Sequence, residues 1–394
     1  MPVDYQQVYD KIRQIGLGSL VRREELKKRR EQARELLERF SSDLDFLRSR
    51  VEAAKAVDVN FRCAMPVDEP LDAACPPPAS IADGTVIAVD GSQINPDRHE
   101  AIQFCLVNVG AVVMVLNSGH APGIQVESEL LYGDEMLSHG IPLNEGMVAM
   151  RRDIREREKL EQLARYMEGN VLTLTDGPIE LWGAKGDDPQ AYNEFVDNYR
   201  TVLSRLSTRG VVHAGYVEKP TADLVLYLLE IAVATEQDLR RIRDYHPLRG
   251  VSDRWLYGER RAPLLPPGHR SAVFKLVSGS DKNYTGALSL HFFYLNVGSD
   301  GHPWPVRVEI PRWVVDDRLK LDLLHCVLLE QCKIMGHRPY PYILHRAHET
   351  AVVKHDEKLQ ITEMLAQELR QREEEMDDIS NKQNAKNLPG RRRR

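Results

Sequence analysis

Short apolar runs and longer amphipathic stretches alternate along most of this 394-residue chain. Runs that are too short for a helix and rich in β-branched residues predict buried strands. The first is Val86–Val89, which we expect to end on Asp90, with Gly91 and Ser92 turning the chain. Further strands are predicted at 102–109, 111–116, 124–131, 171–175, 211–216, 272–277, 288–295 and 306–310. Gly110 is expected to separate the first two of these.

Apolar positions spaced three and four apart predict the helices of the chain. They lie at 143–167, 191–206, 224–234, 318–335 and 343–353. A strand hairpin followed by helix, strand, helix and strand predicts an α/β fold with a mixed sheet. Ligands of such sheets gather at the carboxyl ends of strands, where Asp90 and Asp176 are expected.

Composition shifts along the chain predict four parts. Residues 1–60 are expected to form a helical arm, and the proline-rich residues 61–83 a linker without regular structure. Residues 84–355 form the main domain, with a charged, proline-bearing insertion at about 236–268. Residues 356–394 are predicted to be a charged helical tail that ends in a disordered basic segment.

The arm carries a coiled-coil-like seam. Its apolar positions are Leu37, Phe40, Leu44, Leu47 and Val51, with charged residues between them. This stripe fits a helix that packs on its own domain as well as an arm that dimerises or docks to a partner.

Composition limits the class of protein more than its function. The hydrophobic content of 42% and the charged content of 28% are typical of a soluble globular protein. No apolar run is long enough to span a bilayer. The five scattered cysteines contain no C-x-x-C pair, so neither a zinc ribbon nor a disulfide framework is expected. We therefore expect a cytoplasmic protein. The net charge of −6 argues against a protein that coats nucleic acid, but a local basic groove stays possible. The absence of P-loop, G-x-G-x-x-G, G-x-S-x-G and H-E-x-x-H motifs argues against P-loop, dinucleotide-binding, serine hydrolase and zinc protease chemistry.

Two Asp-Gly pairs follow apolar strands, at Asp90 and at Asp176. Two carboxylates brought close together repel each other, and a cation between them relieves the repulsion. Because the ligands would be hard oxygens, magnesium or manganese is favoured over zinc. The alternative is that each Asp-Gly pair only forms a turn, which is its commonest use.

A third carboxylate is expected from the helix at 143–167. Glu156 and Asp153 share the helix face of the apolar Leu160, whereas Glu158 points nearly opposite. Glu156 is therefore the preferred inward acid and Asp153 the second choice. The same acids would also suit a solvated amphipathic helix.

Three further residues carry possible chemistry. Lys219 follows the strand at 211–216, where it could hold a phosphate or orient a water molecule. Tyr340 could bond a phosphate or stack on a base, and His348 could act as a general acid. A solvated lysine and a surface or core histidine are the plainer interpretations, and His345 dilutes the histidine signal.

Taken together, these segments resemble the NurA family of DNA-repair nucleases over residues 84–355. The matching motifs are VIAVDGSQ around Asp90, R-x-x-x-E at Arg152 and Glu156, LTDGP around Asp176, VEKP with Lys219, VRVEIPRW at 306–313, and YPYILHRAH from Tyr340 to His348. Their order and spacing carry the resemblance.

The resemblance implies an RNase H-like core, a manganese-dependent nuclease acting on DNA ends, a homodimer and a HerA-type hexameric ATPase as partner. It implies that Asp90, Glu156 and Asp176 are metal ligands, that Tyr340 and His348 complete the site, and that Lys219 contacts phosphate or water. We therefore predict a metal-dependent DNA nuclease in which two manganese or magnesium ions activate water and stabilise the leaving oxygen. Its expected substrates are single strands and duplex ends.

Two other classes of function are kept as alternatives. One is a non-catalytic DNA-binding or scaffold subunit of a motor complex. The other is a metal-dependent phosphatase for small phosphate esters, although the VDGS strand lacks the D-x-D motif of a phosphoaspartate route.

Overall fold

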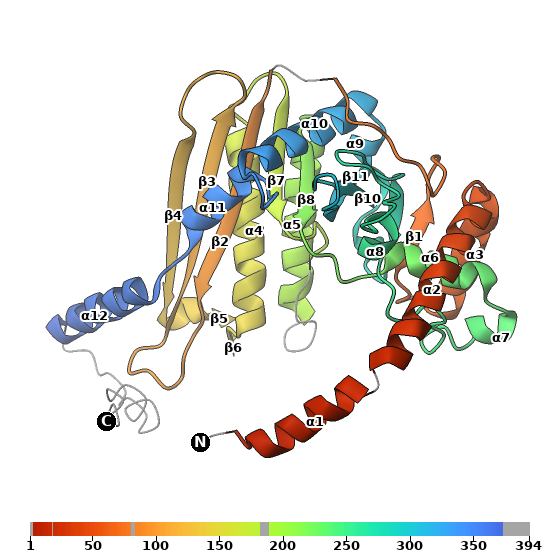
Figure 1. Cartoon of the computed structure of the whole chain (residues 1–394). Coiled ribbons are helices and arrows are strands. Elements are labelled where there is room, and N and C mark those ends of the chain that lie inside the picture. The colour runs from red at the N-terminus through yellow and green to blue at the C-terminus, as the bar shows by residue number, and fades with distance from the viewer. Residues whose placement is uncertain (1–2, 18, 80–82, 182–188, 373–394) are drawn as a thin grey trace. The chain divides into compact units, whose positions relative to one another are not determined.

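The computed structural model describes residues 3–17, 19–79, 83–181 and 189–372 (Figure 1). It divides into two compact units, each made of two chain segments. The first unit comprises 1–79 and 217–329, and the second comprises 80–216 and 330–394. The predicted disordered basic end lies outside the described residues, and the predicted domain boundaries stay a prediction.

The second unit is built on a mixed sheet in which the strands follow the order β8-β7-β2-β3-β4. Its strands are β2 Thr85–Ile94, β3 Phe104–Val115, β4 Gly123–Tyr132, β7 Val171–Asp176 and β8 Val212–Val217. β2, β3 and β4 form an antiparallel meander, while β7 pairs parallel with both β2 and β8. The apolar run from Val86 to Val89 is fully buried in the middle of this sheet.

Helices cover both faces of this sheet (Figure 1). The helices of the unit are α4 Glu145–Ala164, α5 Pro189–Thr208, α11 Tyr342–Ala351 and α12 His355–Gln371. Successive side chains of β3 point to opposite faces of the sheet. Asn108 points to the face covered by α11 and bonds that helix. Val107 and Val109 point to the other face, where they line a 260 Å³ cavity with residues of α4. Asn144 caps α4, since its side chain accepts a hydrogen bond of 3.0 Å from the backbone N–H of Met147. A 3-10 turn, η1 Gly133–Met136, and the short pair β5 Leu137–Ser138 and β6 Ile141–Pro142 connect β4 to α4.

The prediction of two strands separated by Gly110 is wrong. β3 runs unbroken through Gly110, which pairs with Asp90 on one side and Val126 on the other. A Cβ atom built on Gly110 would lie only 2.6 Å from the backbone nitrogen of Ala351 in α11. The glycine therefore makes room for a helix and does not end a strand.

The prediction that the first strand ends at Asp90 is also wrong. β2 continues to Ile94, with Gly91 paired to Val109. A Cβ atom built on Gly91 would lie 2.6 Å from Oε1 of Glu156, so this glycine makes room for side chains of α4. In contrast, Asp176 does end β7, and Gly177 turns the chain there with a φ of +89°.

The first unit carries an antiparallel sheet in the order β1-β9-β10-β11. Its strands are β1 Cys63–Pro66, β9 Phe274–Val277, β10 Leu290–Asn296 and β11 Pro305–Pro311. The helices of its segments are α1 Tyr5–Leu17, α2 Ser19–Phe40, α3 Leu44–Val57, α6 Leu224–Val233, α7 Glu236–Leu239, α8 Asp253–Tyr257, η2 Asp281–Asn283, η3 Gly286–Leu288, α9 Arg312–Val315 and the larger part of α10 Arg318–Ile334. The remaining predicted strands and helices are thus found, with ends shifted by a few residues.

Two predictions for the N-terminal region need correction. The segment 61–83 is not without regular structure, because Cys63–Pro66 pair with β9 as an edge strand. Pro66 is tolerated there, since a proline at the end of an edge strand removes little of the ladder. The apolar seam is divided between two helices, because α2 ends at Phe40 and α3 begins at Leu44.

Four of the five seam residues belong to the core of the first unit, whereas Leu44 is only partly buried. Leu37, Phe40, Leu47 and Val51 are between 0% and 6% exposed. α3 and α6 pack together, and α6 also contacts α2. Of the two interpretations of the seam, the structure therefore supports packing within the chain.

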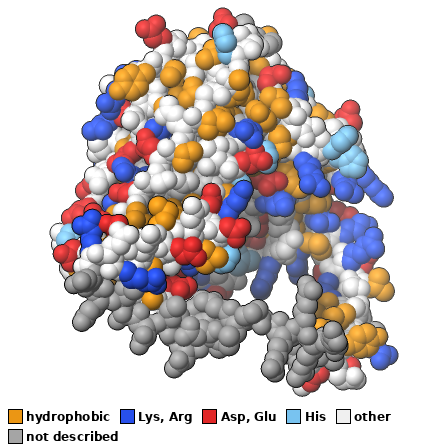
Figure 2. Space-filling view, turned by 90° about the vertical axis from the view of Figure 1, so that its left-hand side faces the viewer, with side chains coloured by type: hydrophobic (Ala, Val, Ile, Leu, Met, Phe, Trp, Pro, Cys, Tyr) orange, Lys and Arg blue, Asp and Glu red, His pale blue; other side chains and the backbone are white. Residues whose placement is uncertain are grey.

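Figure 2 shows acidic and basic side chains together on the face that it presents, with hydrophobic side chains scattered among them. Among the described residues, no helix combines the length and the apolar character needed to cross a membrane.

Candidate active site

Asp90 and Asp176 lie on neighbouring parallel strands of the second unit. β2 and β7 pair through Val89 and Thr175, and the two aspartates follow directly. Partial enclosure by the protein and the negative charge of Asp90 raise the pKa of Asp176. The structure therefore brings together the two carboxylates that the sequence predicts as partners.

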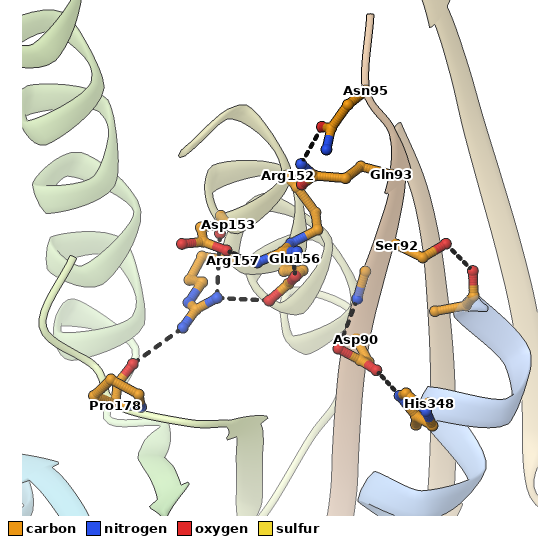
Figure 3. A network of polar contacts seen from close by, with 12 residues as sticks. Asp90, Ser92, Gln93, Asn95, Arg152, Asp153, Glu156, Arg157, Pro178 and His348 are labelled. Carbon is orange, nitrogen blue, oxygen red and sulfur yellow. Dashed lines mark hydrogen bonds and ion pairs between the residues drawn. The ribbon is translucent and has the colours of Figure 1, made fainter. Parts of the chain in front are cut away.

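His348 of α11 contacts the first of these acids (Figure 3). Its Nδ1 lies 2.7 Å from Oδ2 of Asp90, while Oδ1 accepts a hydrogen bond of 2.9 Å from the backbone N–H of Gly91. The carboxylate is only 17% exposed and the imidazole 60% exposed. The carboxylate is thus held by two partners, and the histidine ring still reaches solvent.

The position of His348 depends on how α11 is fixed to the sheet. The carbonyl of Ala351 accepts hydrogen bonds from Ser92 at 2.5 Å and from Asn108 at 2.7 Å. The same serine hydroxyl accepts a hydrogen bond of 3.0 Å from the backbone N–H of Val353. Side chains of β2 and β3 therefore hold the last turn of the helix, three residues beyond His348.

Tyr340 contacts the second acid. Its hydroxyl donates a hydrogen bond to Asp176, which opposes the rise in the pKa of that carboxyl group. Its ring packs edge-on against the buried ring of Tyr216, with centroids 5.5 Å apart. Since Tyr216 is fully buried in β8, it gives Tyr340 a rigid support.

Glu156 is the inward acid of α4, as the helix periodicity predicts. It is 4% exposed, and its Oε2 accepts a hydrogen bond of 2.6 Å from Arg157. Burial raises the pKa of Glu156, and the positive charges of Arg157 and Arg152 oppose this rise. Glu158, by comparison, is 43% exposed and pairs with Arg155 at 3.2 Å.

Lys219 belongs to the other compact unit. It comes two residues after the end of β8 in the sequence, and its Nζ lies 5.9 Å from the centre of the Trp304 ring. This distance suits a cation–π contact. Its expected contact with phosphate stays a prediction.

Sequence reasoning gave no role to Arg157, which is 4% exposed. Besides Glu156, its guanidinium contacts the carbonyl oxygens of Asp153 and Pro178, both at 3.4 Å. It therefore links α4 to the loop that follows Asp176. Its place three residues before Leu160, on the apolar helix face, is the signal that could have identified it.

The carboxylates suit a hard divalent cation by their chemistry. Asp90, Asp176 and Glu156 offer oxygen ligands from three elements, and the charge of Asp90 raises the pKa of the other two. In the described part of the chain, no group of three or more His, Cys, Asp or Glu side chains is already arranged to hold an ion. Glu156 is already engaged by Arg152 and Arg157, whereas the two aspartates contact His348 and Tyr340.

The chain was compared with protein-family models and with solved structures. The family model described as the NurA domain matches residues 84–353. The crystal structure of the NurA nuclease from Sulfolobus solfataricus is similar with a TM-score of 0.50 and 11% identity, over 93% of this chain and 97% of that chain. A crystal structure of NurA with manganese has a TM-score of 0.38 and 10% identity, over 73% of this chain and 90% of that one. The catalytic domain of human endonuclease V has a TM-score of 0.32 and 13% identity, over 80% of this chain and 96% of its own.

No curated protein matches the sequence. At 11% identity the likeness to the Sulfolobus structure concerns the fold. Together with the strand order of the sheet, it confirms the predicted mixed α/β, RNase H-like fold.

Proposed function

Since this chain belongs to the NurA family, a family of nucleases, we propose that it is a metal-dependent deoxyribonuclease that hydrolyses phosphodiester bonds in DNA. The observation that carries the proposal is the pair Asp90 and Asp176 on adjacent parallel strands, inside the matched segment 84–353. A carboxylate pair at this place is suited to bind cations that in turn bind phosphate.

The proposed cofactor is manganese or magnesium, with two ions expected. Asp90 and Asp176 would hold it, with Glu156 as the third ligand. When bound, such an ion supplies a water of lowered pKa and stabilises negative charge on the phosphate.

His348 is proposed to handle a proton of the reaction. Because its Nδ1 faces Asp90, Nε2 is the ring nitrogen left to face a substrate. The carboxylate orients the ring, so that Nε2 is placed to pass a proton to the leaving oxygen. Tyr340 would keep the carboxylate of Asp176 in place. Lys219 is proposed to contact a phosphate or a water molecule.

The substrate and partner proposals rest on family membership. We expect action on single-stranded DNA and on duplex ends, a homodimer, and cooperation with a HerA-type hexameric ATPase. Two alternatives are a scaffold subunit and a phosphatase for small esters, and the experiment below distinguishes both of them from a nuclease.

The test incubates labelled single-stranded and duplex DNA with the protein and manganese, magnesium or a chelator. We expect cleavage with manganese and none with the chelator. D90N and D176N should each lower the cleavage rate by at least about 100-fold, because each removes a carboxylate that binds the ion. E158Q is the matched control, since Glu158 is an acid of the same region that points to solvent.

Circular dichroism of each variant checks that the fold is retained. Near-normal cleavage by either aspartate variant would contradict the metal assignment. A scaffold would leave all DNA intact, and a phosphatase would hydrolyse a chromogenic phosphate monoester while sparing DNA.

A further inference from the structure

Arg152 reaches into the carboxylate cluster of the candidate site (Figure 3). Its Nε lies 3.2 Å from Oε1 of Glu156, and its Nη2 donates a hydrogen bond of 2.8 Å to Oδ1 of Asp153. Its stem crosses β2 at Gly91, since a Cβ atom built there would lie 2.6 Å from Cγ of Arg152. Although partial burial opposes its charge, Asp153, Glu156 and Asp90 raise the pKa of the guanidinium. The positive charge therefore acts on acids of both α4 and β2.

The neighbouring arginine is held differently. The side chain of Arg157 is 5% exposed and is anchored to two backbone carbonyl oxygens besides Glu156. The side chain of Arg152 is 30% exposed and contacts carboxylates. Arg152 can therefore leave Glu156 by rotating toward solvent, whereas Arg157 could leave only by opening the core between α4 and the loop at Pro178.

We propose that Arg152 is a built-in counter-ion that neutralises the carboxylate cluster and must move away from Glu156 when a divalent cation binds there. The inference rests on the proposed function, because it takes Glu156 as a ligand of the ion.

Electrostatics gives the reason for the exchange. Glu156 and Asp90 repel each other, and a positive group beside them relieves the repulsion. A guanidinium and a divalent cation on the same carboxylate oxygen would repel each other in turn. Arg152 therefore keeps the acids close together when no metal is bound. Because the metal has to displace Arg152, the same contact lowers the affinity of the site for the metal.

The experiment measures Mn²⁺ binding by calorimetry and thermal unfolding with and without Mn²⁺, using the full chain. The variants are R152Q and R152M, of which the second keeps an apolar stem over Gly91. R155Q is the matched control, because Arg155 is a 45% exposed arginine of the same helix that pairs with Glu129 and Glu158.

We expect R152Q and R152M to bind Mn²⁺ roughly three- to tenfold more tightly than the wild type, since the cation no longer displaces an ion pair. Without metal both variants should melt at a lower temperature, and Mn²⁺ should raise that temperature more than in the wild type. R155Q should bind Mn²⁺ with an affinity within about twofold of the wild type, because Arg155 pairs with Glu129 and Glu158 and not with the proposed ligands.

Two results would overturn the inference in different ways. If the wild type binds Mn²⁺ and both folded Arg152 variants bind it no more tightly, the counter-ion role is refuted while the nuclease proposal stands. If neither the wild type nor the variants bind Mn²⁺, the metal site of the proposed function fails and this inference fails with it.

Discussion

Replacing Gly110 with alanine tests how closely α11 must approach the sheet to bring His348 to Asp90. The added methyl group would lie 2.6 Å from the backbone nitrogen of Ala351 and 2.8 Å from the carbonyl carbon of Thr350. These are backbone atoms, so no change of side-chain rotamer relieves the contact. Since non-bonded heavy atoms favour about 3.5 Å, the end of α11 has to move by roughly 1 Å.

The cost of this movement can be worked from the contacts at the end of α11. Overpacking in a core costs about 1–3 kcal/mol, and the shift also stretches the hydrogen bonds from Asn108 and Ser92 to the carbonyl of Ala351. We expect G110A to lower the free energy of unfolding by about 2 kcal/mol, or the melting temperature by about 4–8 °C for a unit of this size. The 2.7 Å contact between His348 and Asp90 lengthens as well. A misplacement of about 1 Å can lower the rate of an enzyme up to about 100-fold, and we expect a loss of at least about tenfold.

Thermal unfolding followed by circular dichroism and the DNA cleavage assay measure the two effects. G123A is the matched control in the same sheet, because the nearest atom to a Cβ there is 3.9 Å away and the melting temperature should change by less than about 2 °C. Unchanged stability of G110A would refute the close approach of α11. A lowered melting temperature with full activity would instead refute the role of His348.

Two further predictions concern stability. Burial lowers the pKa of His213 from 6.5 to about 3, so below pH 6.5 the unfolded chain takes up a proton that the folded chain does not. As the pH falls from 6.5 towards 3, this histidine should therefore lower the free energy of unfolding by about 1.4 kcal/mol for each pH unit. Urea unfolding at pH 7 and pH 5 measures this loss. An equal loss of stability in H213Q would contradict the prediction. E69A removes the carboxylate that bonds the fully buried Arg270 at 2.7 and 2.8 Å, and we expect a loss of about 3 kcal/mol. In the same unfolding measurement the exposed control D68N should change by less than about 0.5 kcal/mol, and a similarly small change in E69A would show that the pair contributes little.

The local sequence pattern was sufficient to predict most of the helices and strands and the placement of two acids, Asp176 and Glu156. The apolar run before Asp176 and the glycine after it predict a strand that ends there, and β7 does end at that residue. The periodicity of α4 places Glu156 inward and Glu158 outward, as observed. Both inferences succeed because the side of a helix or strand that faces the core is set by residues a few positions apart.

The same local reasoning failed at the two glycines of the site. An Asp-Gly pair after an apolar run is typical of a turn, yet β2 continues through Gly91, and β3 continues through Gly110. In both cases the glycine is required by a neighbour that is distant in sequence, either Glu156 in α4 or Ala351 in α11.

The family and the candidate residues could thus be named from their order along the chain, because motifs and periodicity are properties of neighbouring residues. The arrangement of these residues in space could not be predicted in this way. The contact between Asp90 and His348 joins residues 258 positions apart, and the placement of Arg152 among the acids depends on how α4 packs across β2. Such distances are set by steric fit and by the balance of buried charges in the folded chain, and neither is encoded in any short stretch of it.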